Sequence, residues 1–150
     1  MSNLDIKIKI LTDNLDRKKE LLKQIEAITE KQEMFFTKLK GEDRNYMIGE
    51  AVKEKQKIID ELMKIDEVFL STFESFKGEL NENRDIYAIE IERMKKKIKE
   101  VTDIDVRIRV REERNRRIFS EVRLENQPKI KGLKASRDYI LKQYEKNSKI

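Results

Sequence analysis

The sequence contains no cysteine, no histidine and no tryptophan, and only one proline and four glycines among its 150 residues. Without cysteine there is no disulfide framework, no thiolate metal site and no thiol nucleophile. Without histidine the commonest general base and the commonest zinc ligand are missing. A glycine-rich phosphate loop is missing as well. The sequence therefore predicts no catalytic site, no metal site and no cofactor, and we expect a protein that is not an enzyme.

Long hydrophobic runs are also missing. No apolar run approaches the roughly 20 residues that a membrane-spanning helix needs. Residues 1–5 do not combine a charged region with an apolar one, as a signal peptide would. We therefore expect a protein of the cytoplasm without a membrane span.

Charged side chains dominate what is present. They make up 43% of the residues, whereas hydrophobic side chains make up 37%. This balance is typical of long helices with one narrow apolar stripe and wide charged faces, and the length gives room for one domain. Residues 1–92 carry a net charge of −5 and residues 93–150 a net charge of +10. Such an asymmetry indicates an acidic protein partner, a nucleic acid or a membrane surface.

Residues 3–40 carry a heptad pattern in which mostly apolar residues recur in alternating steps of four and three. The positions are Leu4, Ile8, Leu11, Leu15, Lys18, Leu22, Ile25, Thr29, Gln32, Phe36 and Leu39. Other apolar residues widen this stripe, which predicts a helix packed in a bundle rather than in a two-stranded coil. Gly41 is expected to end the helix, and residues 42–45 to form a polar turn.

The same stepping continues over residues 51–80 and predicts a second long helix. Phe69, Phe73 and Phe76 lie close together on its stripe, where we expect the bulkiest layer of the core rather than a ligand cage. Residues 81–85 form the second predicted turn. Two short turns imply antiparallel neighbouring helices.

A third stripe begins at Tyr87, but polar residues interrupt it after Val101. Within the interruption, residues 104–111 alternate with a period of two, which alone is typical of a strand. We favour a helix, because the run is short and no second strand is available to pair with it. A bend, or a restarted helix capped by Thr102 or Asp103, would accommodate its β-branched residues.

This third segment also holds a cluster of arginines, at Arg107, Arg109, Arg111, Arg114, Arg116 and Arg117. The cluster is the feature most typical of nucleic-acid binding, but on a helix it spreads over several faces and no aromatic residues interleave with it. A solvated helix face or an acidic protein partner explains it at least as well. Asn115 falls on the apolar stripe, where we expect a buried residue that fixes helix register; contact with a partner is the alternative.

Beyond the break at Pro128, apolar residues again recur at helical spacing in a basic segment. An isolated helix of this length is marginally stable in water, so we expect it either to dock on the bundle or to order on a partner. Its candidate partner-binding residues are Ile130, Leu133, Arg137, Ile140, Leu141 and Tyr144. The predicted fold is all-α: an elongated antiparallel helical bundle or coiled coil of three long helices over residues 1–126, then an amphipathic tail over residues 127–150.

Several stretches carry a family resemblance: residues 54–62 (EKQKIIDEL), residues 65–69 (IDEVF), and a lysine-rich segment that leads into residues 98–110 and 113–115 (ERN). With these stretches and the basic tail, the chain resembles flagellar type III export chaperones of the FlgN kind over roughly residues 4–145. The resemblance implies a cytoplasmic helical protein that binds the C-terminal helices of hook–filament junction proteins before their export. It also implies that the tail carries this partner.

Two other hypotheses stay open. The chain could be a structural coiled-coil protein that self-associates, since three helices with narrow stripes leave apolar surface that a homodimer would cover. It could instead be a basic helical protein that binds nucleic acid through the arginine cluster. The long stripes favour the first two hypotheses equally, and the separate tail favours a chaperone.

Overall fold

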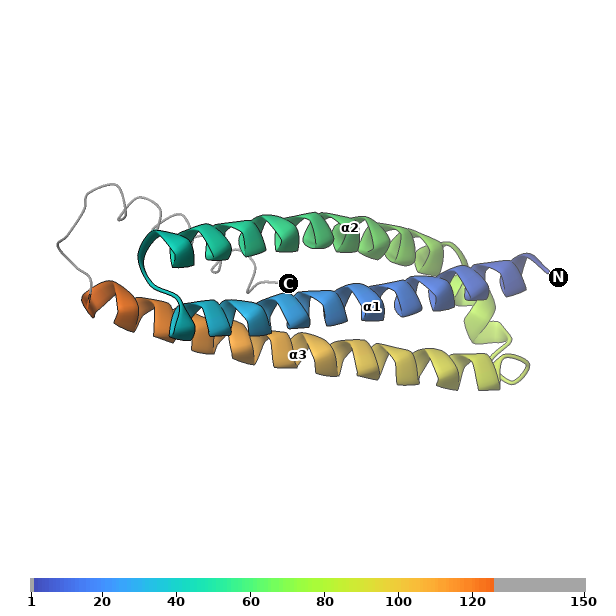
Figure 1. Ribbon diagram of the computed structural model, residues 1–150. Coiled ribbons are helices and arrows are strands. Elements are labelled where there is room, and N and C mark those ends of the chain that lie inside the picture. The colour runs from blue at the N-terminus through green and yellow to red at the C-terminus, as the bar shows by residue number, and fades with distance from the viewer. Residues whose placement is uncertain (1, 126–150) are drawn as a thin grey trace. The chain divides into compact units, whose positions relative to one another are not determined.

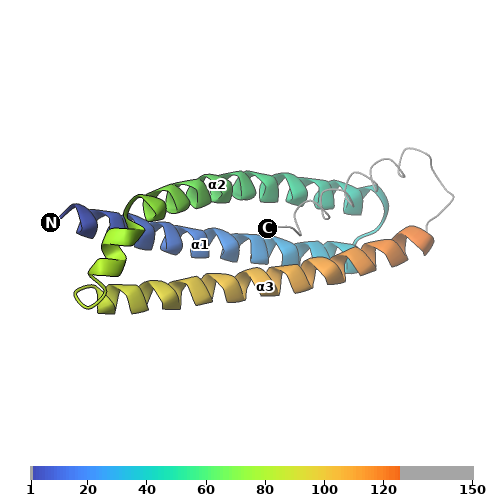
Figure 2. The same ribbon diagram turned by 180° about the vertical axis from the view of Figure 1, so that it is seen from behind.

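The computed structural model describes residues 2–125, which form three helices: α1 (Asn3–Lys38), α2 (Gly41–Glu82) and α3 (Ala88–Glu125) (Figure 1). Figure 2 shows the same helices from behind. No strand occurs among these described residues, and the helices pack on one another, so the all-α bundle of three long helices is confirmed. The predicted tail over residues 127–150 lies outside the described part of the chain.

The start of α1 is fixed by a capping box. The Ser2 hydroxyl accepts a hydrogen bond from the Asp5 backbone N–H, and the Ser2 N–H donates to the Asp5 carboxylate, both at 3.1 Å. These bonds satisfy donors that the first turn of a helix leaves unpaired. The Ser2 N–H, and after it the Tyr87 hydroxyl that donates to Asp5 at 2.8 Å, lower the pKa of the Asp5 carboxyl. The Tyr87 contact also holds the α2–α3 turn against the start of α1.

Only residues 39–40 separate α1 from α2. Gly41 has a φ of 62°, in the left-handed region that glycine adopts without steric strain, and this lets the chain reverse within a very short connection. The prediction of a polar turn at residues 42–45 is wrong, because these residues belong to the first turn of α2. Glu42 and Asp43 stabilise the start of α2, because their negative charges lie near the positive N-terminal end of the helix dipole.

α3 is one unbroken helix. Residues 104–111 stay helical, which confirms the preference for a helix over a strand. Ile104 and Ile108 of this run are buried, because their spacing of four places both on the same face of a helix. The Thr102 hydroxyl donates to the Ile98 carbonyl at 2.8 Å, a bond made within a continuing helix. A restarted helix capped by Thr102 or Asp103 is therefore not present.

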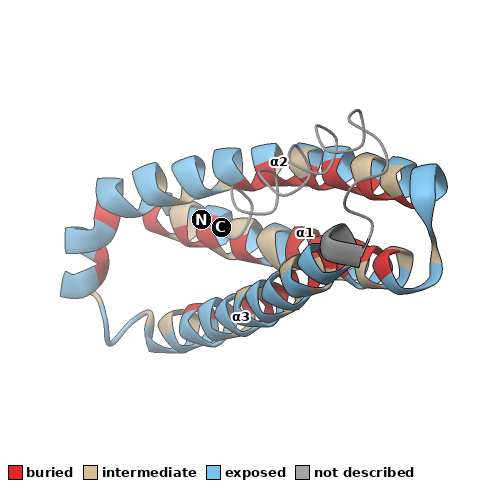
Figure 3. Cartoon of the chain, turned by 90° about the vertical axis from the view of Figure 1, so that its left-hand side faces the viewer, coloured by how far each residue is buried: buried red, intermediate tan, exposed pale blue. Residues whose placement is uncertain are grey.

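The described residues form two compact units, each built from a stretch of all three helices. Unit 1 comprises residues 2–23 and 60–104, and unit 2 comprises residues 24–59 and 105–125. In each unit, buried residues lie on the sides of the helices that face one another, and exposed residues cover the outward sides (Figure 3). Each unit therefore has a core of its own.

Unit 1 has an apolar core. Its buried members are Leu4, Ile8, Leu11, Leu15, Phe76, Leu80 and Met94. Four ion pairs join α1 to its neighbours, two to α2 and two to α3: Arg17–Glu61, Lys18–Asp66, Lys19–Glu100 and Asp16–Lys97. In unit 1, α1 is thus tied to both other helices along its charged flanks.

Unit 2 combines an aromatic layer with a polar one. The rings of Phe36 and Phe119 lie 5.5 Å apart, and both residues cluster with Ile48. The buried polar side chains on the three helices of this unit include Thr29, Gln32, Lys55, Glu112 and Asn115. Buried polar groups are costly unless they bind one another, so their contacts determine how these helices can pack.

Candidate functional site

An apolar groove of about 440 Å³ lies in unit 1. One wall is formed by α2 with Phe69, Phe73 and Leu80, and the other by α3 with Ile91, Met94 and Ile98, while Leu11 of α1 contributes from the core. The volume falls within the range of about 300–1,000 Å³ that is typical of ligand sites. Because the groove is open to solvent, its shape suits the apolar face of a helix better than an enclosed small molecule.

The α2 wall exists because the phenylalanine stripe of this helix is only partly covered. Phe76 is 2% exposed and belongs to the core, whereas Phe73 is 36% exposed and meets Phe76 edge-on, with 6.4 Å between ring centroids. The prediction that all three phenylalanines form one core layer is therefore wrong for Phe73. This ring lines the groove instead.

The α3 wall is exposed in the same way. Ile98 lies on the predicted apolar stripe of this helix, yet it is 44% exposed. Ile98 and Phe73 thus present apolar surface from opposite walls of one groove. Exposed apolar surface that is gathered in one place is typical of a binding site, whereas single exposed apolar residues need no explanation.

The charged residues that line the groove are all cationic. Lys77 lies on the α2 wall, Lys95 on the α3 wall, and Arg84 in the turn that joins the two helices. This turn covers residues 83–87, two residues later than predicted. The groove therefore has an apolar interior, and the charged side chains in its lining are cationic.

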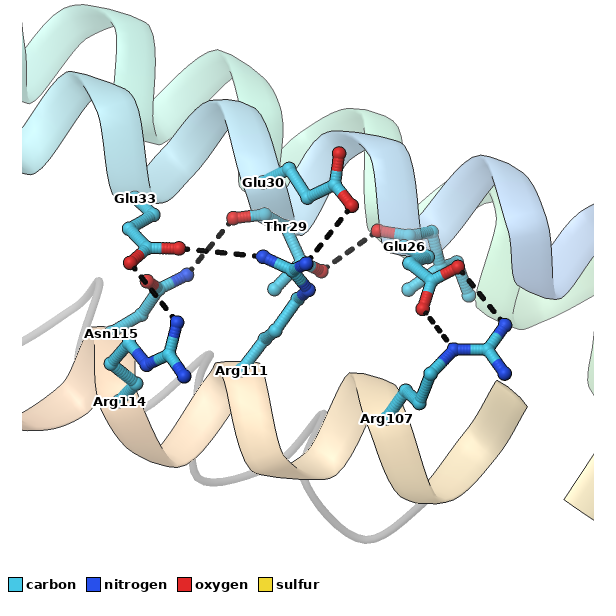
Figure 4. Close-up of polar contacts among 9 residues, drawn as sticks. Glu26, Thr29, Glu30, Glu33, Arg107, Arg111, Arg114 and Asn115 are labelled. Atoms are coloured by element: carbon cyan, nitrogen blue, oxygen red, sulfur yellow. Dashed lines mark hydrogen bonds and ion pairs between the residues drawn. The ribbon is translucent and has the colours of Figure 1, made fainter. Parts of the chain in front are cut away.

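In unit 2, arginines of α3 bind glutamates of α1 (Figure 4). The N–O distances are 2.8 to 3.5 Å, and the pairs are Arg107 with Glu26, Arg111 with Glu30 and with Glu33, and Arg114 with Glu33. Two further arginines bind acidic residues of α3 itself, in the pairs Arg109–Asp105 and Arg116–Glu113. Five arginines of the cluster are thus paired within unit 2, while Arg107, Arg109 and Arg114 stay about half exposed on a solvated face. Contact of the cluster with an acidic partner stays a prediction.

The arginine–glutamate pairs share one constant separation along the sequence. Residues 26 and 107, 30 and 111, and 33 and 114 are each 81 positions apart. A constant offset is expected where two parallel helices pack in register, because both helices advance equally along the chain. The offset becomes visible only once α1 and α3 are known to be neighbours.

Lys55 and Glu112 form a buried ion pair in unit 2, with side chains 1% and 2% exposed. The Lys55 ammonium also donates to Gln32 Oε1 at 2.8 Å, and the Thr29 hydroxyl lies 3.4 Å from Glu112 Oε1. Burial lowers the pKa of Lys55 to about 7, because the charged ammonium loses its hydration. This pair joins α2 to α3 in the unit that lacks the groove.

Asn115 is fully buried, as predicted, and its Nδ2 donates to the Thr29 carbonyl at 3.1 Å. The bond joins α3 to α1 at one register, which is a known role of a buried asparagine between packed helices. Asn115 therefore acts within unit 2 rather than on a surface open to a partner.

Other kinds of site find no support in the part of the chain that the structure describes. Among residues 2–125 no group of three or more acidic, histidine or cysteine side chains is placed to hold a metal ion. No helix of this part combines the length and apolar character needed to cross a membrane.

The predicted partner-binding residues of the tail lie outside the described residues and stay a prediction: Ile130, Leu133, Arg137, Ile140, Leu141 and Tyr144.

Comparison with known proteins gives no match to a family model, to a curated protein or to a solved structure. The resemblance to FlgN-type chaperones therefore stays a prediction from the sequence. The candidate site rests on the geometry of unit 1 alone.

Proposed function

We propose that this chain is a non-catalytic protein that binds an amphipathic helix of a partner protein in the groove of unit 1. The observation that carries the proposal is the exposed apolar surface on both walls, at Phe73 of α2 and Ile98 of α3. A partner helix between these walls would bury its own apolar stripe against two helices at once. This is the helix-in-groove mode of recognition.

The biological role that we propose is that of a cytoplasmic export chaperone of the FlgN kind. Its partners would then be the C-terminal helices of flagellar hook–filament junction proteins. Such helices have apolar faces that are covered only after assembly, so a chaperone that covers them beforehand prevents early association. The all-helical bundle, the uncovered groove and the sequence resemblance support this role.

The dimensions of the groove fit reversible binding. Three apolar side chains of a partner helix would contribute about 1.5–3 kcal/mol each when fully buried. Association costs at least about 4 kcal/mol in lost freedom of motion. At most about 5 kcal/mol remains, so the groove alone supports only weak binding, with a dissociation constant of roughly 0.2 mM or higher. A second contact, made by the predicted tail, would raise the affinity through its high effective concentration.

The competing hypotheses are affected differently by the structure. Nucleic-acid binding loses much of its support, because several arginines of the cluster are paired with acidic residues of this chain. Self-association would cover the same groove with a second copy of the chain. The decisive experiment therefore has to separate a partner helix from a second copy.

Titration calorimetry of the full chain with synthetic C-terminal helices of hook–filament junction proteins tests the proposal. The variant Phe73→Ser/Ile98→Ser removes apolar groups from both walls. The matched control, Met63→Ser/Val106→Ser, removes two residues that are 60% and 54% exposed and lie outside the groove. We expect about tenfold weaker binding or more by the groove variant, and unchanged binding by the control.

Two results would contradict the proposal. One is the absence of binding by the unmodified chain, and the other is an equal loss in the groove variant and in the control. Sedimentation velocity without peptide compares the oligomeric state of the unmodified chain with that of the groove variant. A dimer that the groove variant converts to a monomer would favour the self-associating coiled-coil protein.

A further inference from the structure

The charges around the groove restrict which helix can occupy it. Lys77 pairs with Glu74 at 2.6 Å and Lys95 pairs with Glu92 at 3.5 Å, each within one turn of its own helix. All four of these side chains are at least half exposed to solvent. Exposed pairs of this kind contribute little to stability, so both lysines can exchange their partner for an incoming carboxylate.

Arg84 provides a third cation at the groove. It lies in the turn between α2 and α3, and within residues 2–125 it forms no ion pair. The carboxylates paired with the lysines do not line the groove, whereas Lys77, Arg84 and Lys95 do. A ligand in the groove therefore meets cations from the α2 wall, from the α3 wall and from the turn.

We propose that the groove of unit 1 is specific for an acidic amphipathic helix, with apolar side chains against Phe73 and Ile98 and carboxylates opposite Lys77, Arg84 and Lys95. This inference rests on the proposed function and adds the chemistry of the partner. Complementary charges at the edge of an interface select the partner and speed its association, while the apolar contacts supply most of the affinity.

The length of the walls sets the size of the occupant. From Phe69 to Leu80 the α2 wall extends about 16 Å, which is three helical turns at 1.5 Å per residue. A partner helix would therefore present about three apolar layers, at spacings of three and four residues. Its acidic residues would flank that stripe on both sides, since lysines lie on both walls.

Charge repulsion argues against two other occupants of the groove, the C-terminal residues 126–150 and a second copy of the chain. Residues 126–150 carry seven basic and two acidic side chains, a net charge of +5, which the cations at the groove would repel. A second copy that docks groove to groove in a two-fold dimer would place the same three cations against one another. An acidic helix of another protein would meet neither of these charge repulsions.

Two designed helical peptides of about 18 residues test the inference on the full chain. Both carry the same leucine stripe, and their flanking positions are all glutamate in one and all lysine in the other. Fluorescence anisotropy is expected to show at least about tenfold tighter binding of the glutamate peptide, and a loss of that preference at high salt. The variant Lys77→Glu/Arg84→Glu/Lys95→Glu is expected to reverse the preference.

The control variant Lys9→Glu/Lys23→Glu/Lys64→Glu changes the net charge equally in unit 1 at residues that do not line the groove. It is expected to keep the preference for the glutamate peptide. Equal reversal in both variants would mean that net charge alone selects the peptide, and this would overturn the inference. Circular dichroism of each variant confirms that its helices are intact.

Other outcomes separate this inference from the proposed function. If both peptides bind equally and Phe73→Ser/Ile98→Ser weakens both, the groove binds helices without charge selection: the proposed function stands and this inference fails. If neither peptide binds, this inference fails as well, and the junction-protein titration decides the proposed function separately. A photo-crosslinker in place of Phe73 identifies the occupant, and crosslinks to residues 126–150 or to a second copy would overturn the inference.

Discussion

Lys55 of α2 and Glu112 of α3 meet as an ion pair in the interior of unit 2, where neither side chain is more than 2% exposed. Gln32 accepts another hydrogen bond from Lys55, so the ammonium has two polar neighbours in a layer without access to water. Burying two charges is costly, and their attraction offsets that cost only while both are present. The pair therefore restricts α2 and α3 to the one register in which the charges meet.

Removing one member of this pair is expected to destabilise the protein strongly. Lys55→Ala leaves the buried Glu112 carboxylate without its hydrogen-bond donor and opens a cavity in the polar layer, which costs about 3–5 kcal/mol. The double variant Lys55→Met/Glu112→Leu replaces both charges with apolar groups and is expected to be nearly as stable as the unmodified chain, or more stable. Urea unfolding followed by circular dichroism measures both. A double variant as unstable as Lys55→Ala would refute the explanation.

The stability of the protein is expected to depend on pH through Lys55. Burial lowers its pKa from 10.5 to about 7, so the folded protein loses this proton at a lower pH than the unfolded chain does. The neutral amine that remains still donates hydrogen bonds to Gln32 and Glu112. Between these values the unfolded chain binds more protons, and stability therefore rises as the pH increases from about 7 towards 10.5. The slope is at most about 1.4 kcal/mol per pH unit.

Urea unfolding at a series of pH values between about 7 and 9 measures this dependence. The rise is expected to disappear in Lys55→Met and to persist in Lys57→Met, which changes an exposed lysine on the same helix. If the stability of the unmodified chain fell over this interval relative to that of Lys55→Met, the assigned direction of the pKa shift would be wrong.

The ion pairs between α1 and α3 are expected to contribute much less. Glu33 pairs with Arg111 at 3.5 Å and with Arg114 at 3.4 Å, but the three side chains are 27% to 54% exposed. Glu33→Ala should therefore cost no more than about 1 kcal/mol, and less in 1 M salt, where charges are screened beyond about 3 Å. Thermal unfolding at low and high salt checks this. A cost as large as that of Lys55→Ala would contradict it.

The predicted tail gives a separate test of where the partner binds. The variant Leu133→Ser/Ile140→Ser/Tyr144→Ser is expected to lose partner binding while its thermal stability stays nearly unchanged, because the tail is expected to order mainly on the partner. Calorimetry with the partner helix and differential scanning calorimetry of the variant alone measure the two effects. A large fall in unfolding temperature would show instead that these residues belong to the core.

The helices could be predicted because each carries its own periodic signal. The heptad stepping of the first segment identifies Leu4, Ile8, Leu11 and Leu15, and all four are buried in unit 1. The run at residues 104–111 was ambiguous only in isolation. A helix is the better choice, because the run is short and a lone strand has nothing with which to pair.

The groove could not be predicted, because a stripe shows which residues are apolar and not what covers them. Phe73 and Phe76 are both stripe residues, yet one lines the groove and the other is buried. The difference depends on how α2 and α3 are placed around α1 in unit 1. A single sequence without this packing does not contain it.

The buried ion pair left a weak signal in the sequence. Lys55 interrupts an otherwise apolar stripe, Glu112 is one of several polar residues in the third stripe, and their charges are opposite. Taken separately, each residue only interrupts the apolar periodicity of its helix. Their pairing becomes readable only when the two helices are aligned, because 57 residues separate them along the chain.

Hydrogen–deuterium exchange of the full chain, with and without the C-terminal helix of a junction protein, tests the central claim most directly. A helix bound in the groove is expected to slow amide exchange in residues 69–81 and 91–98, the stretches of α2 and α3 that line it, since binding stabilises the bound segments. Protection confined to other parts of the chain, with these two stretches unchanged, would contradict the account.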